Sequence, residues 1–326
     1  MPDAGKAYMK NVLIDTDPGM DDALAIILAL KSRKLRTLAV TAATGNLTSD
    51  KTAANALRVL DLLDRGDIPV GQGPLLPLDG DYPVDPFSHG SDGLAESHFP
   101  ASARTVDPRP AAQLIVDTVN AHAGDISIAA LAPLTNLALA LEIDPQLPEK
   151  VTELVIIGGS YGLTPYAWSQ ATGDNAVSEW NIFVDPEAAH RVFRAGFDLV
   201  AVGLDIATHP RINFRDSDLD RLRRARTPEA ALAARVVDYV KGRGYQSYCS
   251  LIDSVAVAAL IDPTLIECVE VRCDVERRGE LTRGMTVVER RAHHGRKDLP
   301  VIRTVSGLDF DRFLDLVTTV LSDPAG

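Results

Sequence analysis

Short apolar runs of strand length alternate with longer amphipathic runs of helical length through the first two thirds of this chain. Residues 11–15 (NVLID) are predicted to form a buried strand, and residues 21–32 the helix that follows it. A second such pair is predicted at residues 36–42 and 48–63. Further strands are expected at 126–131, 153–158 and 199–204, and further helices at 133–141 and 186–194. Because strands that alternate with helices are joined by right-handed crossovers, the pattern predicts an α/β fold: an open, mostly parallel sheet with helices on both faces and a Rossmann-like core.

Residues 75–110 interrupt this alternation with a segment rich in Pro, Gly, Asp and Ser. A connection of that length is unusual inside a compact domain, so it is either a surface loop or an active-site loop. Its His89 could contact a ligand or be merely solvated. Beyond it, helical patterns are found at 216–240, 253–260 and 309–321, and strand-like ones at 267–276 and 285–291. No internal repeat or linker is evident, so residues 1–326 are predicted to form a single domain.

The composition is that of a globular protein, with 46% apolar and 24% charged residues and a net charge of −12. A negative surface repels phosphate backbones and anionic lipid, so neither nucleic acid nor a membrane is an expected partner, whereas a neutral small molecule is. Three cysteines without paired spacing argue against a disulfide framework. Residues 1–10 lack the apolar core of a signal peptide, and the most apolar run, 23–30, is too short to span a bilayer. A cytoplasmic protein is therefore expected.

Four aspartates, Asp15, Asp17, Asp21 and Asp22, fall within eight residues between the first strand and the first helix. Open α/β sheets bind ligands at the carboxyl ends of their strands, and a Pro-Gly pair forces a tight turn here. Carboxylates brought together in this way repel one another unless a cation lies among them, and such oxygen ligands suit Ca²⁺ or Mg²⁺ better than zinc. Alternatively, Asp21 and Asp22 cap the helix, which leaves Asp15 and Asp17 without a role.

Residues 14–25 (IDTDPGMDDALA) resemble the N-terminal signature of the inosine–uridine-preferring nucleoside hydrolases. Further motifs of that family follow in the same order: TGN at 44–46, HG at 89–90, APLTN at 132–136, IGGSY at 157–161, EWNI at 179–182, DPEAA at 185–189, LID at 251–253 and GELTRG at 279–284. Together they span nearly the whole chain. The resemblance implies a Ca²⁺-dependent enzyme that cleaves the bond between ribose and nucleobase of a nucleoside, assembled as a homodimer or homotetramer.

The resemblance also implies which residues bind the metal. One Ca²⁺ per subunit would be held by Asp17, Asp22, Asp253 and the backbone carbonyl of Leu131. Asp17 would in addition act as general base toward the attacking water. Asp253 stands beside a predicted helix start, so capping is a second role that is compatible with metal binding.

The same resemblance assigns the sugar contacts. Asp21 would bind the ribose 2′-hydroxyl, and Glu179 and Asn181 the hydroxyls on the 5′ and 3′ sides. Ile157 would pack near the sugar, and Asn46 would lie close to ribose and base. A pocket lined with carboxylates favours the positive charge that develops on ribose as the glycosidic bond breaks. Taken alone, the Glu179–Asn181 segment is more typical of a polar edge beside a core tryptophan than of a binding site.

The chain departs from the family pattern at Ile252, where many relatives carry a histidine directly before the aspartate matched here to Asp253. An isoleucine cannot protonate the departing base, so the leaving-group step and the base preference are open. Tyr245, Tyr248 and Trp168 are candidates to stack on the base or to protonate it, although each taken alone is more typical of ordinary packing.

Two other functions compete with this interpretation. A phosphatase of the haloacid-dehalogenase type also begins with a strand that ends in Asp-x-Asp, and it would use Asp15 as nucleophile and Asp17 as acid/base with Mg²⁺. The Pro-Gly-x-Asp-Asp run and the Glu-x-Asn element have no place in that scheme. The second alternative is a non-catalytic nucleoside-binding protein that has lost turnover through the change at Ile252.

Overall fold

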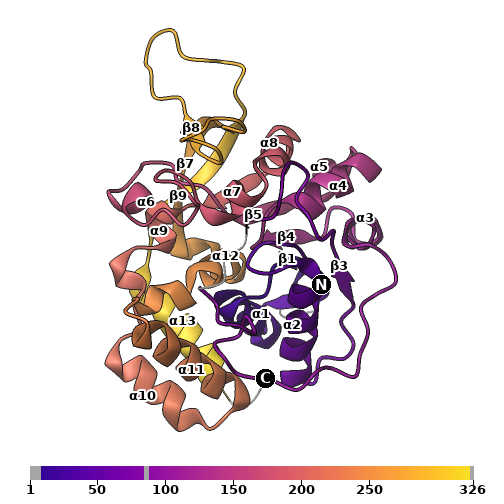
Figure 1. Cartoon of the computed structure of the whole chain (residues 1–326), viewed down its shortest axis with the longest axis vertical. Coiled ribbons are helices and arrows are strands. Elements are labelled where there is room, and N and C mark those ends of the chain that lie inside the picture. The colour runs from indigo at the N-terminus through magenta and orange to yellow at the C-terminus, as the bar shows by residue number, and fades with distance from the viewer. Residues whose placement is uncertain (1–8, 84–87, 324–326) are drawn as a thin grey trace, which may run out of the picture.

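The computed structural model describes residues 9–83 and 88–323, which fold around one nine-stranded sheet (Figure 1). Most of the N-terminal segment considered above (residues 1–8) and residues 84–87 of the long loop lie outside the described residues. The strand order is β3-β2-β1-β4-β5-β6-β9-β7-β8. The strands are β1 Lys10–Thr16, β2 Leu35–Ala42, β3 Val70–Gln72, β4 Ser127–Ala130, β5 Glu153–Ile157, β6 Leu199–Val202, β7 Ile266–Val275, β8 Thr286–Val288 and β9 Val301–Leu308.

The pairing of the strands confirms the predicted sheet. Strands from β3 across to β9 pair in parallel, and antiparallel pairing is found where β7 meets β9 and β8 at one edge. Because these strands run parallel, their carboxyl ends lie at the same edge of the sheet, where ligands bind in open α/β folds.

Helices cover both faces of the sheet, as predicted, because successive strand residues point to opposite faces. Val12 and Ile14 of β1 belong to one hydrophobic cluster, and Leu13 between them belongs to another. The first cluster includes helices α1 Met20–Lys31, α2 Ser49–Leu62, α10 Asp216–Ala225, α11 Pro228–Gly242, α12 Ile252–Ile261 and α13 Phe310–Ser322. The second includes α3 Ala111–Ala121, α4 Thr135–Ile143 and α8 Pro186–Arg194. Within the described ranges, no helix has both the length and the apolar character needed to cross a membrane.

The second half of the chain differs from the prediction in three places. The helical pattern at 216–240 is broken at Arg226, which has a φ of 56°, and Thr227 then caps the new helix α11. The strand expected at 285–291 extends only over Thr286–Val288. Strand β9, which lies between β6 and β7, has no counterpart in the prediction. In the first half of the chain, β3 and α3 were likewise not predicted.

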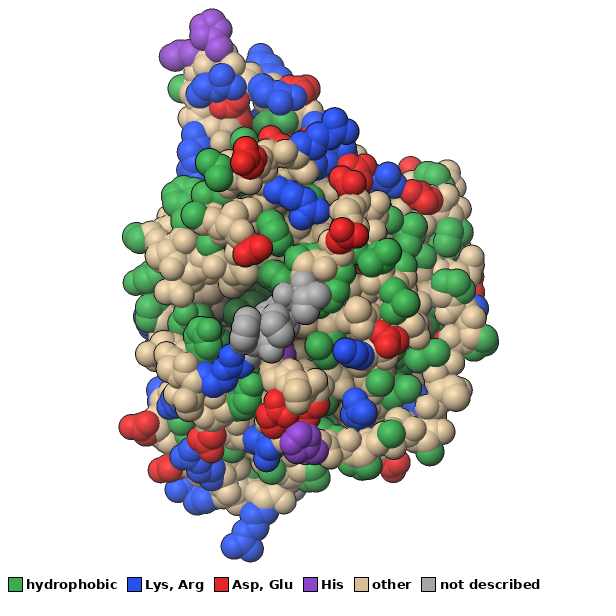
Figure 2. Space-filling model, viewed as in Figure 1, with side chains coloured by type: hydrophobic (Ala, Val, Ile, Leu, Met, Phe, Trp, Pro, Cys, Tyr) green, Lys and Arg blue, Asp and Glu red, His purple; other side chains and the backbone are tan. Residues whose placement is uncertain are grey.

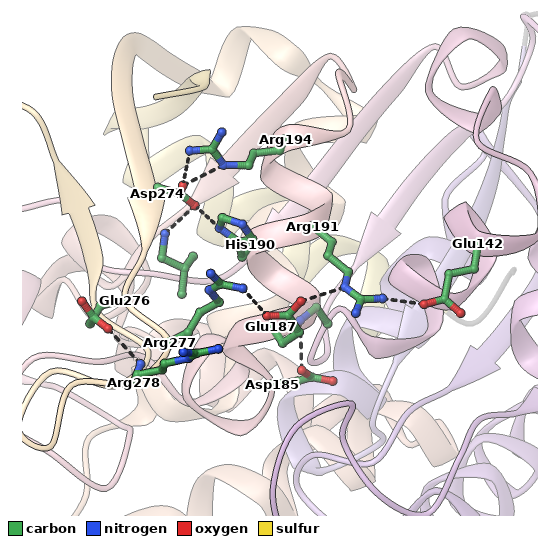
Figure 3. Close-up of polar contacts among 12 residues, drawn as sticks. Glu142, Asp185, Glu187, His190, Arg191, Arg194, Asp274, Glu276, Arg277 and Arg278 are labelled. Atoms are coloured by element: carbon green, nitrogen blue, oxygen red, sulfur yellow. Dashed lines mark hydrogen bonds and ion pairs between the residues drawn. The ribbon is translucent and has the colours of Figure 1, made fainter. Parts of the chain in front are cut away.

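Strands β7 and β8 form the base of an arm that projects from the body of the molecule (Figure 1), and Lys and Arg side chains gather on it (Figure 2). Ion pairs tie this base to α8. Nδ1 of His190 lies 2.7 Å from Oδ1 of Asp274, and Nε of Arg194 donates to Oδ2 of Asp274 at 2.8 Å. Arg277 donates to Glu187 at 2.5 Å (Figure 3). These contacts fix the base of the arm to helix α8.

Candidate active site

The turn between β1 and α1 is held by one carboxylate. Asp22 accepts hydrogen bonds from the backbone amides of Asp17 (3.2 Å) and Gly19 (3.0 Å) and from the hydroxyl of Thr16 (2.5 Å). The helix-capping role considered for Asp22 is thus present. It fixes the acidic turn at the carboxyl end of β1.

Three carboxylates converge at this turn. Asp21 and Asp22 lie in the first turn of α1, and Asp253 lies in the first turn of α12, which packs against α1. Each offers an oxygen within 4.8 Å of the others, and all three side chains are buried. Burial, and then the charges of Asp21, Asp22 and Asp17, raise the pKa of Asp253 well above its usual range. Such a group of buried like charges could hold a metal ion.

The unsatisfied oxygens around the turn fit a cation. Oδ2 of Asp17 accepts from the backbone amide of Asn46 at 2.6 Å, whereas Oδ1 is buried and accepts no hydrogen bond from the described residues. Oδ1 of Asp21 is likewise buried and accepts no hydrogen bond from them. A Cβ at Gly45 would lie 2.0 Å from Oδ2 of Asp17, so only glycine permits this approach. A hard cation such as Ca²⁺ binds oxygen atoms, and a buried oxygen that accepts no hydrogen bond is available for this role.

The expected sugar-binding residues lie at the N-terminus of the short helix α7 Trp180–Val184. The carboxylate of Glu179 accepts from the backbone amides of Gly159 (3.1 Å), Asn181 (2.8 Å) and Ile182 (3.0 Å). Burial nevertheless raises the pKa of Glu179 to about 7. The amide of Asn181 donates to the carbonyls of Leu131 (2.9 Å) and Ile157 (3.1 Å) and so joins the ends of β4 and β5.

A cavity of about 350 Å³ opens at this edge of the sheet. Its lining includes most of the residues expected at the site: Asp21, Asn46, His89, Leu131, Ile157, Glu179, Asn181, Tyr245, Tyr248 and Asp253. Asp17 and Asp22 are almost fully buried and are not part of the lining. The structure does not place Trp168 there either. Other members of the lining were not predicted: Met20, Ser88, Ser169, Gln170, Ala171, Thr172, Trp180, Leu204, Thr208, Val240 and Cys249.

The loop histidine and the two tyrosines occupy different settings in this cavity. Nδ1 of His89 accepts from the backbone amide of Met20 at 3.1 Å and lies 3.7 Å from Oδ1 of Asp21, so His89 is packed rather than merely solvated. Burial raises the pKa of Tyr248 to about 12, and its hydroxyl donates to Oε1 of Gln170 at 2.9 Å. Tyr245 is 52% exposed.

Asp15 is separated from the cavity. It is fully buried, accepts from the hydroxyl of Thr41 (2.6 Å) and the amide of Asn136 (2.8 Å), and is not part of the cavity lining. Burial raises the pKa of Asp15 to about 7. A phosphatase nucleophile must reach its substrate, so this position argues against the haloacid-dehalogenase alternative.

Comparison with known proteins agrees with this geometry. The family model described as inosine-uridine preferring nucleoside hydrolase matches residues 12–315. The pyrimidine-specific ribonucleoside hydrolase RihA of Shewanella sp. strain MR-7 is 36% identical over 318 residues, covering 95% of this chain and 96% of that protein. The solved structure of a plant nucleoside hydrolase, PpNRh1, has 32% identity and a TM-score of 0.86, covering 97% of this chain and 99% of its own.

A second solved structure, the purine-preferring ribonucleoside hydrolase from Gardnerella vaginalis, has 28% identity and a TM-score of 0.83, covering 96% of this chain and 98% of its own. The similarity thus extends over nearly the full length of each protein and includes the sheet edge that carries the cavity. The chain belongs to the inosine–uridine-preferring nucleoside hydrolase family, a family of N-glycoside hydrolases.

Proposed function

We propose that this protein catalyses the Ca²⁺-dependent hydrolysis of the N-glycosidic bond of ribonucleosides, which gives ribose and the free nucleobase. The observation that carries the proposal is the group of buried carboxylates Asp21, Asp22 and Asp253, of which Asp21 and Asp253 line a cavity of about 350 Å³. In addition, Asp17 Oδ1 and Asp21 Oδ1 are buried and accept no hydrogen bond from the described residues. Carboxylates placed there stabilise positive charge on a ribose ring in the transition state.

One Ca²⁺ per subunit is proposed to bind to Asp17, Asp22, Asp253 and the carbonyl oxygen of Leu131. This donor set consists of oxygen atoms alone, which suits calcium and disfavours zinc. A bound divalent cation supplies the charge that makes a neighbouring water acidic enough to react at neutral pH.

Asp17 is proposed to take the proton of the attacking water. One of its oxygens is held by the amide of Asn46, and the other has no partner among the described residues. Burial and the charge of Asp22 raise the pKa of Asp17, which makes its carboxylate a stronger base than an exposed aspartate.

Five residues are proposed to bind the sugar. Asp21 binds the 2′-hydroxyl, Glu179 and Asn181 bind the hydroxyls on the 5′ and 3′ sides, and Ile157 and Asn46 lie against the ring. Glu179 and Asn181 are pre-positioned, because backbone amides and carbonyls already fix both side chains. His89 is proposed to close the same cavity beside Asp21.

The departing base receives no proton from Ile252. With a pKa of about 12, Tyr248 retains its proton too firmly to be an efficient acid near neutral pH. Tyr245, which is part of the cavity lining and 52% exposed, is therefore the better candidate for stacking on the base or protonating it.

The proposal is tested by a panel of purine and pyrimidine nucleosides scored for free ribose, with and without EDTA. We expect ribonucleosides to be cleaved, 2′-deoxynucleosides to react far more slowly because Asp21 loses its partner, and EDTA to abolish turnover. Full activity after exhaustive chelation would exclude the metal. Calorimetric binding of nucleosides without release of base would show a binding protein, and cleavage of phosphate esters alone would show a phosphatase.

We also propose an oligomeric state and a cellular location for the enzyme. The family resemblance supports a homodimer or homotetramer, for which sedimentation analysis is the direct measurement. Cys249, Cys268 and Cys273 are all free thiols, which supports the reducing cytoplasm as the place of action.

A further inference from the structure

A second cavity, the arm cleft, has a volume of about 840 Å³ and lies between helix α8 and the arm. None of its described lining residues belongs to the lining of the candidate active site. Lys and Arg side chains gather on this part of the molecule (Figure 2), although the chain as a whole has a net charge of −12. The lining holds six arginines: Arg194, Arg277, Arg278, Arg290, Arg291 and Arg296. Among the described residues, three carboxylates share it: Asp274, Glu276 and Glu289.

Most of these charges are already paired. Asp274 accepts from Nε of Arg194 at 2.8 Å (Figure 3), and Glu289 accepts from Nε of Arg291 at 2.9 Å. Such pairs fix the guanidinium groups in the walls of the cleft and leave neither carboxylate to neutralise a further arginine. Two more arginines pair with carboxylates outside the lining, Arg277 with Glu187 and Arg296 with Asp298.

Two arginines of the arm cleft, Arg278 and Arg290, have no carboxylate partner in the described part of the chain. Arg278 is exposed, and the nearby Glu276 accepts from the backbone amides of Arg278 and Gly279 rather than from a guanidinium. Arg290 donates to the carbonyl oxygen of Tyr161, a neutral group that fixes the side chain without cancelling its charge. A guanidinium without a counter-charge is a binding group for phosphate, whose oxygens match its planar fork.

The shape and the apolar part of the cleft restrict what kind of anion fits. Apolar side chains lie in the same lining, namely Val275, Val287, Val288 and Leu299, and Val287 is 43% exposed. They favour an anion that also carries an organic group. A volume of about 840 Å³ is ample for a small metabolite, since the candidate active site has about 350 Å³. A long polyanion is disfavoured, because the acidic remainder of the surface repels it.

We propose that the arm cleft is a second ligand site, which binds a small phosphate monoester through Arg278 and Arg290 with the organic group against the apolar lining. The site is separate from the nucleoside cavity and does not depend on the proposed function. It gives the arm a binding role of its own.

The test is calorimetric titration of the protein with phenyl phosphate, inorganic phosphate and phenol, in Ca²⁺ and at a constant ionic strength set with KCl. Phenyl phosphate has both the charge and the apolar group, so we expect saturable binding that is tighter than that of inorganic phosphate, and none of phenol. Arg278→Gln and Arg290→Gln should each weaken the binding of phenyl phosphate by about tenfold or more. Arg33→Gln is the matched control, because Arg33 is exposed, is not part of the cleft and should leave the affinity unchanged.

Arg278→Gln should also keep the parent rate of nucleoside cleavage, since Arg278 is remote from the lining of the nucleoside cavity. Binding that both cleft variants leave unchanged would locate the anion elsewhere, such as at the proposed Ca²⁺, and would overturn the inference. So would the absence of saturable binding together with a lower mass of Arg278→Glu in sedimentation, because that result marks the cleft as a contact with a second copy of the chain. Titration does not require turnover, so it decides the inference even if no nucleoside is cleaved.

Discussion

At the scale of single residues, the substitution Asp22→Asn separates two roles of that side chain, helix capping and the proposed metal binding. The asparagine oxygen can still accept from the amide of Gly19 and cap α1, but the negative charge is lost. We expect Ca²⁺ binding by calorimetry to be lost and kcat/KM to fall by orders of magnitude, with little change in the helix content. Asp50→Asn in the first turn of α2, which is exposed and is not part of the cluster, is the matched control and should bind the cation normally.

The acidic turn was predictable from the sequence, whereas part of the cavity lining was not. Asp17, Asp21 and Asp22 are within six residues of one another, so a single tight turn brings them together independently of the rest of the chain. Asp253 was found through family resemblance. Gln170 lies in a loop, and its position against Tyr248 depends on tertiary packing that no local pattern encodes.

Asp15 gives the protein a pH-dependent stability. Its pKa is about 7 when folded and about 3.9 when unfolded, so the folded state binds more protons between these values. The resulting stabilisation is complete below about pH 4 and is lost as the pH rises through 7. In urea unfolding with EDTA present, Asp15→Asn should therefore show a weaker fall of the unfolding free energy between pH 5 and 7, by at most about 1.4 kcal/mol per pH unit. Identical slopes in both proteins would contradict this account.

At the scale of elements, most of the alternating strands and helices of the first half were predicted, whereas β3, α3 and β9 were not. β9 (VIRTVSGL) exposes Val301 and buries Thr304, so its sequence does not have the pattern of a buried strand. It is central only because β6 and β7, both distant in sequence, pair with it. The break after α10 could have been predicted, because Thr227 is a typical N-cap residue and Pro228 is favoured in the first turn of a helix.

Gly159 links the end of β5 to α7, and its replacement should disturb both stability and sugar binding. Its φ of +83° is strained for other residues, and an added Cβ would lie 2.7 Å from the Thr286 side chain and 2.9 Å from the Tyr161 hydroxyl. Its amide also donates to Glu179. Gly159→Ala should lower the unfolding free energy by about 1–3 kcal/mol and raise KM for nucleosides. Gly124→Ala, also at positive φ but with open space around it, should lose stability through backbone strain alone and keep its KM.

At the scale of the whole molecule, the two hydrophobic clusters share the strands of one sheet, which is why a single domain over residues 1–326 stays our prediction. A shared sheet should unfold in one cooperative calorimetric transition. Because the proposed Ca²⁺ site is assembled only in the folded protein, a cation concentration of a hundred times Kd should stabilise the entire transition by about 2.7 kcal/mol. The shift should be larger at pH 8 than at pH 5.5, where protons compete for the carboxylates. Two separate transitions, or a shift of only one of them, would contradict a single unit.

Cation binding at the buried oxygens of Asp17 and Asp21, which accept no hydrogen bond from the described residues, would have a further consequence for the protein in a living cell. Proteases cleave the opened form of a protein in proportion to its population, and about 2.7 kcal/mol corresponds to roughly a hundredfold difference in that population. Newly made chains that never meet the ion would therefore be degraded faster than those that do. The supply of the ion would set how many copies of the enzyme survive, in addition to how fast each copy works.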